Sequence, residues 1–362
     1  MPAGLENFIS LDLISVFEVI LLGFIGGVLS GFIGSGGAFF MTPGMMNIGV
    51  LGPIAVGSNI THKFGKAMMG SKKHGELGNV DKKLGVFLIF TAAIGINIAV
   101  AITTALFAEG GDSHGTGKGA AANLYISLVF VCSLSLVAIS MLRDILNTSK
   151  EDVGPSRKIS DFLSKLRLFP MIYFPVADVK VSLWVLLAVG LATGYMAGTI
   201  GVGGFIGVPA MIYVFGIPTA VAAGTELFLA MFMGCWGALN YAFQGMVDIR
   251  LTLLLYLGSL LGIYIGAYGT KVVKEVVIRF VTAVIILLCV LSRGIAIPIY
   301  MRQLGWMDFN PSYDELFNQT SKLLLFISGF SGVGVILFNV VRAYIRKSKI
   351  HASLASLVTP SK

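Results

Sequence analysis

The sequence predicts an all-α, polytopic integral membrane protein built from two related halves, and three observations support this fold class. First, 56% of the 362 residues are hydrophobic and only 12% are charged, so the mean hydropathy of +0.88 is far above that of soluble proteins. Second, the apolar residues form runs, several of which can span a bilayer at ~1.5 Å per helical residue. Third, a glycine-rich pattern occurs twice, at an offset of 167 residues.

The repeated pattern is a cluster of glycines that interrupts an apolar run. Seven of the fifteen residues in 23–37 are identical to those in 190–204. We call the two clusters knot 1 (Gly34, Ser35, Gly36 and Gly37) and knot 2 (Gly201, Gly203 and Gly204). The register continues downstream, where Gly-Asn-Val-Asp at 78–81 aligns with Gly-Met-Val-Asp at 245–248. Paired glycine breaks in the two halves of a membrane protein point to a binding site.

The first half begins with an apolar run at 13–34, which is long enough to cross a membrane. After knot 1, the run 38–51 has only about half to two-thirds of the length of a span. A proline near a helix start then opens the next segment. The remaining expected segments of this half are 53–70, 84–107 and 124–142.

The second half repeats this order, and a last segment without a counterpart follows it. Its expected segments are 181–200, 205–217, 219–243, 251–269 and 277–299, with the extra one at 323–343. The chain therefore divides into a first transmembrane repeat (1–142), a cytoplasmic linker (143–180), a second transmembrane repeat (181–299) and a final helix with a cytoplasmic tail (300–362).

Lysine and arginine counts predict the orientation, because basic residues accumulate in cytoplasmic loops. Loop 71–83 holds four of them, the linker seven and the tail from Arg342 five, whereas residues 1–12 hold none. We therefore expect the N-terminus outside and the C-terminus inside the plasma (inner) membrane. Loop 238–250, which aligns with loop 71–83, holds only Arg250 and is expected outside, so the halves are predicted to be inverted repeats.

Inversion requires an odd number of crossings in each half, and counting the short segments as crossings gives five. The chain then has eleven transmembrane segments, or about nine if 38–51 and 205–217 belong to re-entrant hairpins. In either arrangement a broken first element is expected in each half, consisting of a span, a glycine break and a short return.

The chemistry of the knots suits an anion. Glycines allow positive φ and close approach to a ligand, and the helix that starts after a break presents unpaired N–H groups and a positive dipole end. Two such ends that converge near the middle of the bilayer would form an oxyanion cradle. The alternative is that the glycines only allow close helix packing, which is our interpretation of Gly23, Gly27 and Gly31 at a spacing of four.

A second set of candidates follows the proline in each half. Ser58 and Asn59 align with Thr225 and Glu226, and small polar groups beside the knots suit oxyanion coordination. Lys63 lies about ten residues, or ~15 Å, into its segment, and Glu226 is similarly deep in its own. Ionisable residues at such depth are expensive and are functional candidates.

Structural alternatives remain open for the titratable candidates. Lys63 could snorkel to the cytoplasmic side, and we expect this of Lys66. His62 is a candidate proton relay together with Glu226, or else a hydrogen-bonded packing residue. Arg293 is expected to snorkel to the outer surface, and Asp81 and Asp248 are expected to be helix N-caps.

Several function classes are disfavoured. The three cysteines are widely spaced in apolar runs and fit no disulfide or metal pattern. No facing carboxylates and no nucleophile triad can be defended, so we expect neither an enzyme nor a cofactor or metal site. The net charge of +8 is assigned to cytoplasmic loops and not to nucleic-acid binding.

The order of these motifs resembles the TauE/SafE family of permeases, which are proposed to move sulfite, sulfoacetate and other organosulfonates. The resemblance covers most of 13–107 and 181–269. The residues that match by position are Gly34, Gly36, Gly37, Pro43 and Ser58 with Gly201, Gly203, Gly204, Pro209 and Thr225. The departures are the stretch Thr61-His62-Lys63, Glu226, the long linker and the extra last segment.

The resemblance implies a secondary carrier for a small sulfur-containing anion. We expect alternating-access transport of a sulfite-like or sulfonate oxyanion bound between the knots, coupled to a proton or a sodium ion. An anion channel, a carrier for another small anion and a metal-cation carrier are the alternatives. The sequence fixes neither the direction of transport nor the oligomeric state.

Overall fold

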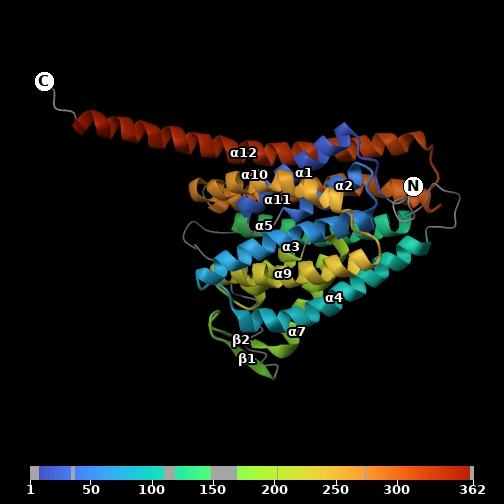
Figure 1. The fold of residues 1–362 in the computed structure, drawn as a ribbon, viewed down its shortest axis with the longest axis horizontal. Coiled ribbons are helices and arrows are strands. Elements are labelled where there is room, and N and C mark those ends of the chain that lie inside the picture. The colour runs from blue at the N-terminus through green and yellow to red at the C-terminus, as the bar shows by residue number, and fades with distance from the viewer. Residues whose placement is uncertain are drawn as a thin grey trace.

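The computed structural model describes residues 8–33, 37–109, 119–147, 169–201, 203–273 and 275–358. These residues form helices that lie side by side in one elongated bundle, with a single short β-hairpin at one edge (Figure 1). The elements of the first half are α1 (Leu13–Ile33), α2 (Ala38–Asn47), α3 (Gly52–Glu76), α4 (Lys82–Glu109) and α5 (Ala120–Asn147). The later elements are the strands β1 (Met171–Phe174) and β2 (Val179–Ser182), the helices α7 (Leu183–Ile200) and α8 (Gly204–Pro209), the π-helical turn η1 (Ala210–Val214), and α9 (Thr219–Phe243), α10 (Ile249–Val272), α11 (Glu275–Gln303) and α12 (Ser312–Val358).

Every apolar segment expected from the sequence is helical, and eight of the described helices are long and apolar enough to cross a membrane. The others are α2 and α8, which are short, and α3, which carries several lysines. The all-helical membrane fold class is therefore confirmed.

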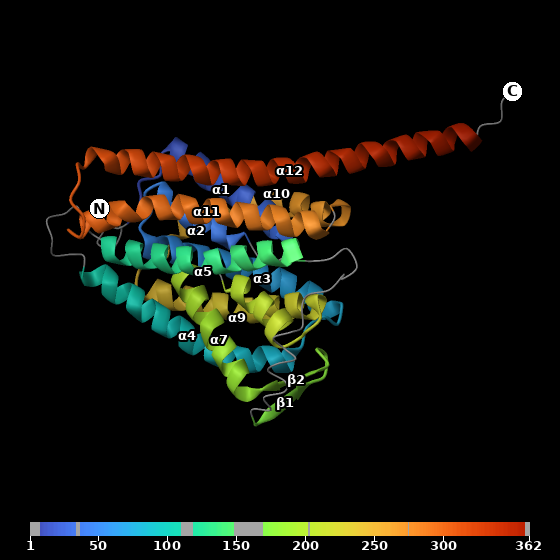
Figure 2. The same ribbon diagram turned by 180° about the vertical axis from the view of Figure 1, so that it is seen from behind.

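Two features of the fold were not expected. Part of the predicted linker forms the antiparallel hairpin β1–β2, in which Met171 pairs with Ser182. The last helix, α12, has 47 residues, far more than the predicted segment 323–343. It lies on the opposite side of the bundle from the hairpin and extends beyond the other helices (Figure 2). At ~1.5 Å per residue it is about 70 Å long, more than twice the hydrocarbon thickness of a bilayer.

The short helices after the knots are return legs. Gly37 packs against Gly26 of α1, Gly44 packs against Leu22, and Gly49 faces Ile9 just before α1. α2 therefore runs back along α1 to the end of the bundle where α1 begins. With 10 residues it covers about half of a bilayer, so α2 is too short to be a second full span beside α1.

The second half has the same break. α7 ends at Gly201, whose φ of +76° is the left-handed conformation that favours glycine. The chain then turns back, and Gly203 and Gly207 both pack against Thr193 of α7.

The two halves are interlocked by glycine contacts. α1 packs along α10, and α4 packs along α7. In the first pair Gly23, Gly27 and Gly31 approach the backbone of Leu255, Ser259 and Ile263. In the second pair Gly190, Gly194 and Gly198 approach Leu88, Ala92 and Ile96. Adding 167 to the three glycines of α1 gives those of α7, and subtracting 167 from their partners on α10 gives those on α4. The packing role predicted for the first three glycines is therefore confirmed.

α3 and α9 cross each other antiparallel in the middle of the bundle. Ile60 contacts Gly237, Phe64 contacts Gly234 and Leu227 contacts Gly70. These two helices carry Lys63 and Glu226, so the fold brings a largely buried charged residue of each half to one central interface.

Candidate functional site

The described parts of the two knots lie beside this central interface. Gly37, Gly201, Gly203 and Gly204 are buried. Gly34, Ser35 and Gly36 lie outside the described residues. The site is therefore built from the start of α2, the end of α7, the start of α8, and the middle turns of α3 and α9.

Asn59 lies between the start of α2 and the end of α7. Its side chain is fully buried, and its Nδ2 donates to Ala38 O at 2.9 Å and to Thr42 Oγ1 at 2.8 Å. Thr42 Oγ1 in turn donates to Ile200 O at 3.1 Å, at the end of α7. Phe39 and Phe205 meet edge to face nearby, with their ring centroids 4.7 Å apart. Asn59 thus connects α2 to the α7 terminus through Thr42, while its buried Oδ1 has no hydrogen-bond partner among the described residues.

Glu226 occupies the corresponding position in the second half, but its surroundings differ. Glu226 is only 3% exposed, and neither of its carboxylate oxygens has a hydrogen-bond partner among the described residues. Its charged neighbour is Lys63, whose Nζ lies 4.0 Å from Oε1, at the outer limit of an ion pair. Lys63 itself is largely buried, with 13% of its side chain exposed.

Two neighbours complete this environment. Oε2 of Glu226 lies against Gly207, where the absence of a side chain leaves room for the carboxylate. The methyl group of Thr193 contacts Gly207 and its carbonyl oxygen contacts Gly203, while its buried hydroxyl has no hydrogen-bond partner among the described residues. We call Lys63, Glu226, Thr193, Gly203 and Gly207 the Lys63–Glu226 cluster.

The electrostatics of this cluster are incomplete without a further group. Removing two charges from water costs several kcal/mol per ion, which a buried pair recovers only with close geometry and additional hydrogen bonds. Here the pair is loose and two polar side chains lack partners. Buried polar groups in folded proteins are nearly always satisfied, so the groups without partners make this cluster a candidate binding site.

Ser58 and Thr225 are engaged by loop backbone. Ser58 Oγ accepts a hydrogen bond from the backbone N–H of Asp248 at 3.0 Å, and Thr225 Oγ1 accepts one from the N–H of Asp81 at 3.0 Å. The two contacts are related by the same offset of 167. The hydroxyls therefore hold the loops before α10 and α4, and a ligand would have to displace these bonds.

The capping roles predicted for Asp81 and Asp248 are confirmed. Asp248 is the N-cap of α10 and accepts from Arg250 N at 3.0 Å, and Asp81 accepts from Leu84 N at 3.0 Å. Asp81 also accepts from the backbone of Val176 in the hairpin turn, at 3.1 Å.

His62 lies on a different face of α3 from the ion pair. It is 1% exposed, and its Nε2 is 2.8 Å from Ser259 Oγ on α10. Its ring packs against Tyr256, with centroids 4.6 Å apart. Lys66, one turn after Lys63, is partly buried and has no ion pair with any described side chain.

A family model described as "Sulfite exporter TauE/SafE" matches residues 19–293. The chain belongs to the sulfite exporter TauE/SafE family. This match runs from α1 into α11 and includes the whole Lys63–Glu226 cluster, and it confirms the resemblance noted in the sequence. TauE/SafE proteins are membrane transporters and not enzymes.

Curated relatives agree with this assignment. The "Probable membrane transporter protein YjnA" of Bacillus subtilis (strain 168) is 28% identical over 272 residues, which cover 75% of this chain and 96% of the relative. Two other proteins of the same organism, "Probable membrane transporter protein YdhB" and "Probable membrane transporter protein YunE", are each 24% identical and cover 72% and 75% of this chain and 93% and 94% of their own length. No solved structure matches the chain significantly.

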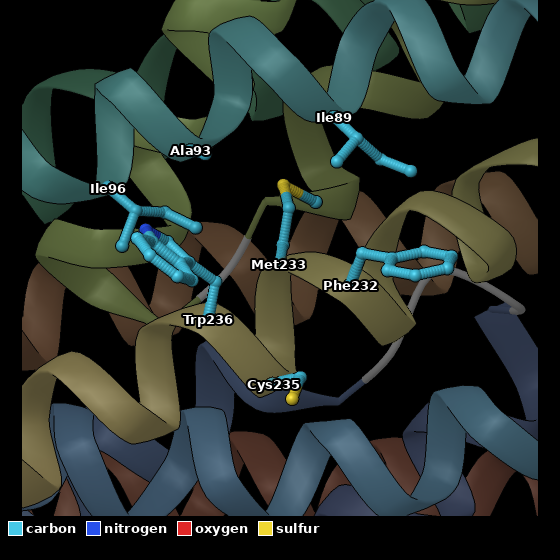
Figure 3. A pocket seen from close by; sticks show the side chains of 7 residues that line it. All are labelled: Ile89, Ala93, Ile96, Phe232, Met233, Cys235 and Trp236. Atoms are coloured by element: carbon cyan, nitrogen blue, oxygen red, sulfur yellow. The ribbon is translucent and has the colours of Figure 1, made fainter.

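The TauE/SafE chain also has a crevice between α4 and α9 (Figure 3). It has a volume of about 180 Å³ and is lined by Ile89, Ala93, Ile96, Phe232, Met233, Cys235 and Trp236. Met233 separates it from Gly203 of knot 2, since its Cε would lie 3.1 Å from a Cβ at that glycine. The lining is almost entirely apolar, so this crevice suits hydrocarbon and not an anion.

Sequence reasoning missed two groups. Thr193 gave no signal because it has no polar counterpart in the first half, where Gly26 occupies the aligned position. Near knot 2 on α5 and α7, Tyr125 and Tyr195 share a hydrogen bond of 2.5 Å, and Thr199 lies 3.4 Å from the Tyr125 hydroxyl.

The prediction that Arg293 extends to the outer surface was wrong, because Arg293 is only 1% exposed. The prediction assumed that a long side chain near a helix end can always extend to water. Here α2 and α12 pack over it, as its contacts with Asn47 and the neighbouring Ser292–Ser321 bonds show.

Proposed function

We propose that this chain is a secondary transporter that moves a small sulfur oxyanion, such as sulfite or an organosulfonate, across the plasma membrane by alternating access. The observation that supports this most directly is the Lys63–Glu226 cluster, a loose buried ion pair at the interface between the halves. Family membership supports a small anionic substrate, and the pair supplies a cation that can bind it.

The charges suggest how substrate and proton are coupled. Lys63 carries one positive charge, which can balance either the carboxylate of Glu226 or a bound anion, but not both at low dielectric. When a substrate anion binds Lys63, Glu226 must take up a proton to avoid an uncompensated charge. When the anion leaves, the ion pair forms again. Substrate and proton would therefore move together through one site.

We further infer that the two halves are inverted repeats. The contacts of α1 with α10 recur between α7 and α4, where each residue is replaced by the one that aligns with it in the other half. α3 and α9, which are equivalent to each other under this exchange, cross antiparallel. A two-fold axis along the helices would make equivalent helices parallel, whereas an axis perpendicular to them makes them antiparallel. The exchange therefore supports an axis in the membrane plane, which is typical of alternating-access carriers.

The proposed orientation follows the basic loops. The α3–α4 connection and the tail after Arg342 are rich in lysine and arginine and are placed inside. The short α2 helix and the start of α3 are then near the outer side, and the N-terminus is outside. In this arrangement the proposed site is reached from the cytoplasm along α3, past Lys66.

The proposal is tested by flux into proteoliposomes that contain the full chain. Sulfite, thiosulfate, sulfate and small sulfonates are offered with a pH gradient, with a sodium gradient and with neither. We expect saturable accumulation of a sulfur oxyanion that the pH gradient increases.

Other results would replace parts of this proposal. Conductance without accumulation against a gradient would indicate an anion channel. Stimulation by the sodium gradient alone would assign the coupling role to sodium. If no sulfur anion moved while the protein stayed monodisperse, the substrate assignment would be wrong.

A further inference from the structure

A second buried cation, Arg293, lies on α11, outside the α3–α9 interface that holds the Lys63–Glu226 pair. Arg293 on α11 is among the largest fully buried side chains of the described chain. It contacts the last residue of α2 and the phenol of Tyr300, but no carboxylate lies within ion-pair distance of it among the described residues.

The acidic groups of the neighbouring helices are engaged elsewhere. Glu18 of α1 pairs with Lys322 of α12 at 2.5 Å, and Asp314 of α12 pairs with Arg302. The charge of Arg293 is thus met only by neutral groups. A buried charge without a counter-ion costs several kcal/mol, so an anion at this place would be favoured.

The hydrogen bonds around Arg293 leave donors unused. Arginine has five N–H donors, and the bonds to Asn47 Oδ1 at 3.0 Å and to the Tyr300 hydroxyl use only two of them. Nε is buried and has no partner among the described residues. Because Tyr300 accepts from the guanidinium, its own hydroxyl proton remains to be donated.

The rest of the network has no unused acceptor of comparable strength. Asn47 Oδ1 accepts from Arg293 and lies 3.1 Å from Ser321 Oγ, whose single proton it shares with the carbonyl of Ser292. Asn47 Nδ2 donates one proton to Ser292 Oγ at 3.3 Å. Ser292 and Ser321 donate to each other's backbone carbonyls, at 2.6 and 2.7 Å. The unused groups are therefore N–H and O–H donors around one cation.

We propose that Arg293, Tyr300 and Asn47 form a binding site for a small inorganic anion of the chloride type, separate from the transport site. The buried guanidinium supplies the charge, and the free N–H and O–H groups supply directed hydrogen bonds. The anion would fasten α11 to α2 and α12. Tyr300 and Ser321 lie beyond the family match, which ends at Arg293, so the site depends on the additional C-terminal part of this chain.

The test uses thermal unfolding of the purified full chain in detergent. Chloride is titrated against gluconate, a much bulkier anion, at constant ionic strength and with one cation. We expect the melting temperature of the wild type to rise with chloride, and this rise to be absent in Arg293→Gln and reduced in Tyr300→Phe.

Two controls separate this site from other effects. Arg302→Gln removes a cation of the same helix that is already paired with Asp314, and it should keep the chloride response. Lys63→Met removes the proposed transport cation and should also keep it, so failure of the transport proposal leaves this test intact.

An unchanged chloride response in Arg293→Gln would overturn the proposal, as would a wild type that responds to neither chloride nor nitrate. A response only to added anionic lipid would assign the arginine to a headgroup and overturn it as well. If Arg293→Gln does not fold, broadening of the chloride-35 resonance by the wild type and by Tyr300→Phe gives the same comparison. Equal broadening would count against the site.

Discussion

Asn59 and Glu226 occupy corresponding positions in the two halves, yet the neutral amide is hydrogen-bonded through its nitrogen whereas the carboxylate has no hydrogen bond among the described residues. The amide nitrogen of Asn59 makes two hydrogen bonds to α2, to Ala38 O and to Thr42 Oγ1, and Thr42 in turn bonds the end of α7. The carboxylate of Glu226 makes none with the described residues and faces Lys63 at 4.0 Å. The same position of the duplicated fold thus holds a structural hydrogen-bonding residue in the first half and an incompletely paired charge in the second.

This difference shows where a duplicated fold can specialise. The shared contacts, such as those of Ser58 and Thr225 with the opposite loops, are kept in both halves because each loop needs its backbone satisfied. The central position is not needed twice, since the bonds from Asn59 to Thr42 and from Thr42 to Ile200 already connect α2 with the end of α7. Its counterpart is therefore free to carry a proton or a charge.

The largest effect is expected from Glu226→Gln. The amide keeps the shape but cannot bind or release a proton, so accumulation driven by a pH gradient should fall to the level without a gradient. Exchange of labelled for unlabelled substrate should persist, because Lys63 is then always free for the anion. Counterflow and gradient-driven uptake in the same proteoliposomes measure both.

Lys63→Met is the matched variant for this experiment and should abolish exchange as well as uptake. Removing one partner of a buried ion pair costs about 3–5 kcal/mol, so both variants need a check of folding by size-exclusion chromatography. Gradient-driven uptake that survives in Glu226→Gln would end the assignment of the coupling role to this side chain.

The next effect concerns the space that Gly207 leaves for the carboxylate. A methyl group there would collide with Glu226 Oε2, so Gly207→Ala should displace Glu226 and lower the uptake rate strongly. Gly75→Ala is the control, because it is also a helical glycine but has no atom within 4 Å of the added carbon. Equal uptake by the two variants would mean that the carboxylate position is unimportant.

A smaller effect on transport, but a clear one on stability, is expected from Asn59→Ala. The change removes the bonds to Ala38 and Thr42, and an unsatisfied buried group costs about 1–3 kcal/mol. Thermal unfolding should therefore occur at a lower temperature, while coupling to the pH gradient is kept. If Asn59→Ala lost coupling to the pH gradient without losing stability, Asn59 would have a role in transport like that proposed for Glu226.

Much of the fold could be predicted from the sequence, because apolar length and glycine spacing directly determine helices and their close packing. The broken first elements and the loop caps Asp81 and Asp248 followed from the duplication itself. The hairpin at 171–182 and the length of α12 could not be predicted, since both lie where the duplication gives no second copy for comparison.

The site was predicted only in part. Lys63 and Glu226 stood out because charge at such depth is rare, and the structure brings them together. The partners of a hydroxyl or an arginine depend on which helix packs over it, which no local pattern encodes. This explains why Ser58 and Thr225 were expected to face a ligand and why the burial of Arg293 was missed.

The smallest effects should come from Ser58→Ala and Thr225→Val, and here the two halves should behave alike. Each change removes the acceptor of one loop N–H, of Asp248 or of Asp81, at a cost of about 1–3 kcal/mol. The unfolding temperatures should fall by similar amounts, and the KM for the substrate should stay that of the wild type. A raised KM in either variant would show that its hydroxyl contacts the anion, because a loop contact alone changes stability without changing substrate affinity. Since the loops lie at opposite ends of the bundle, the double variant should lose the sum of the two single losses.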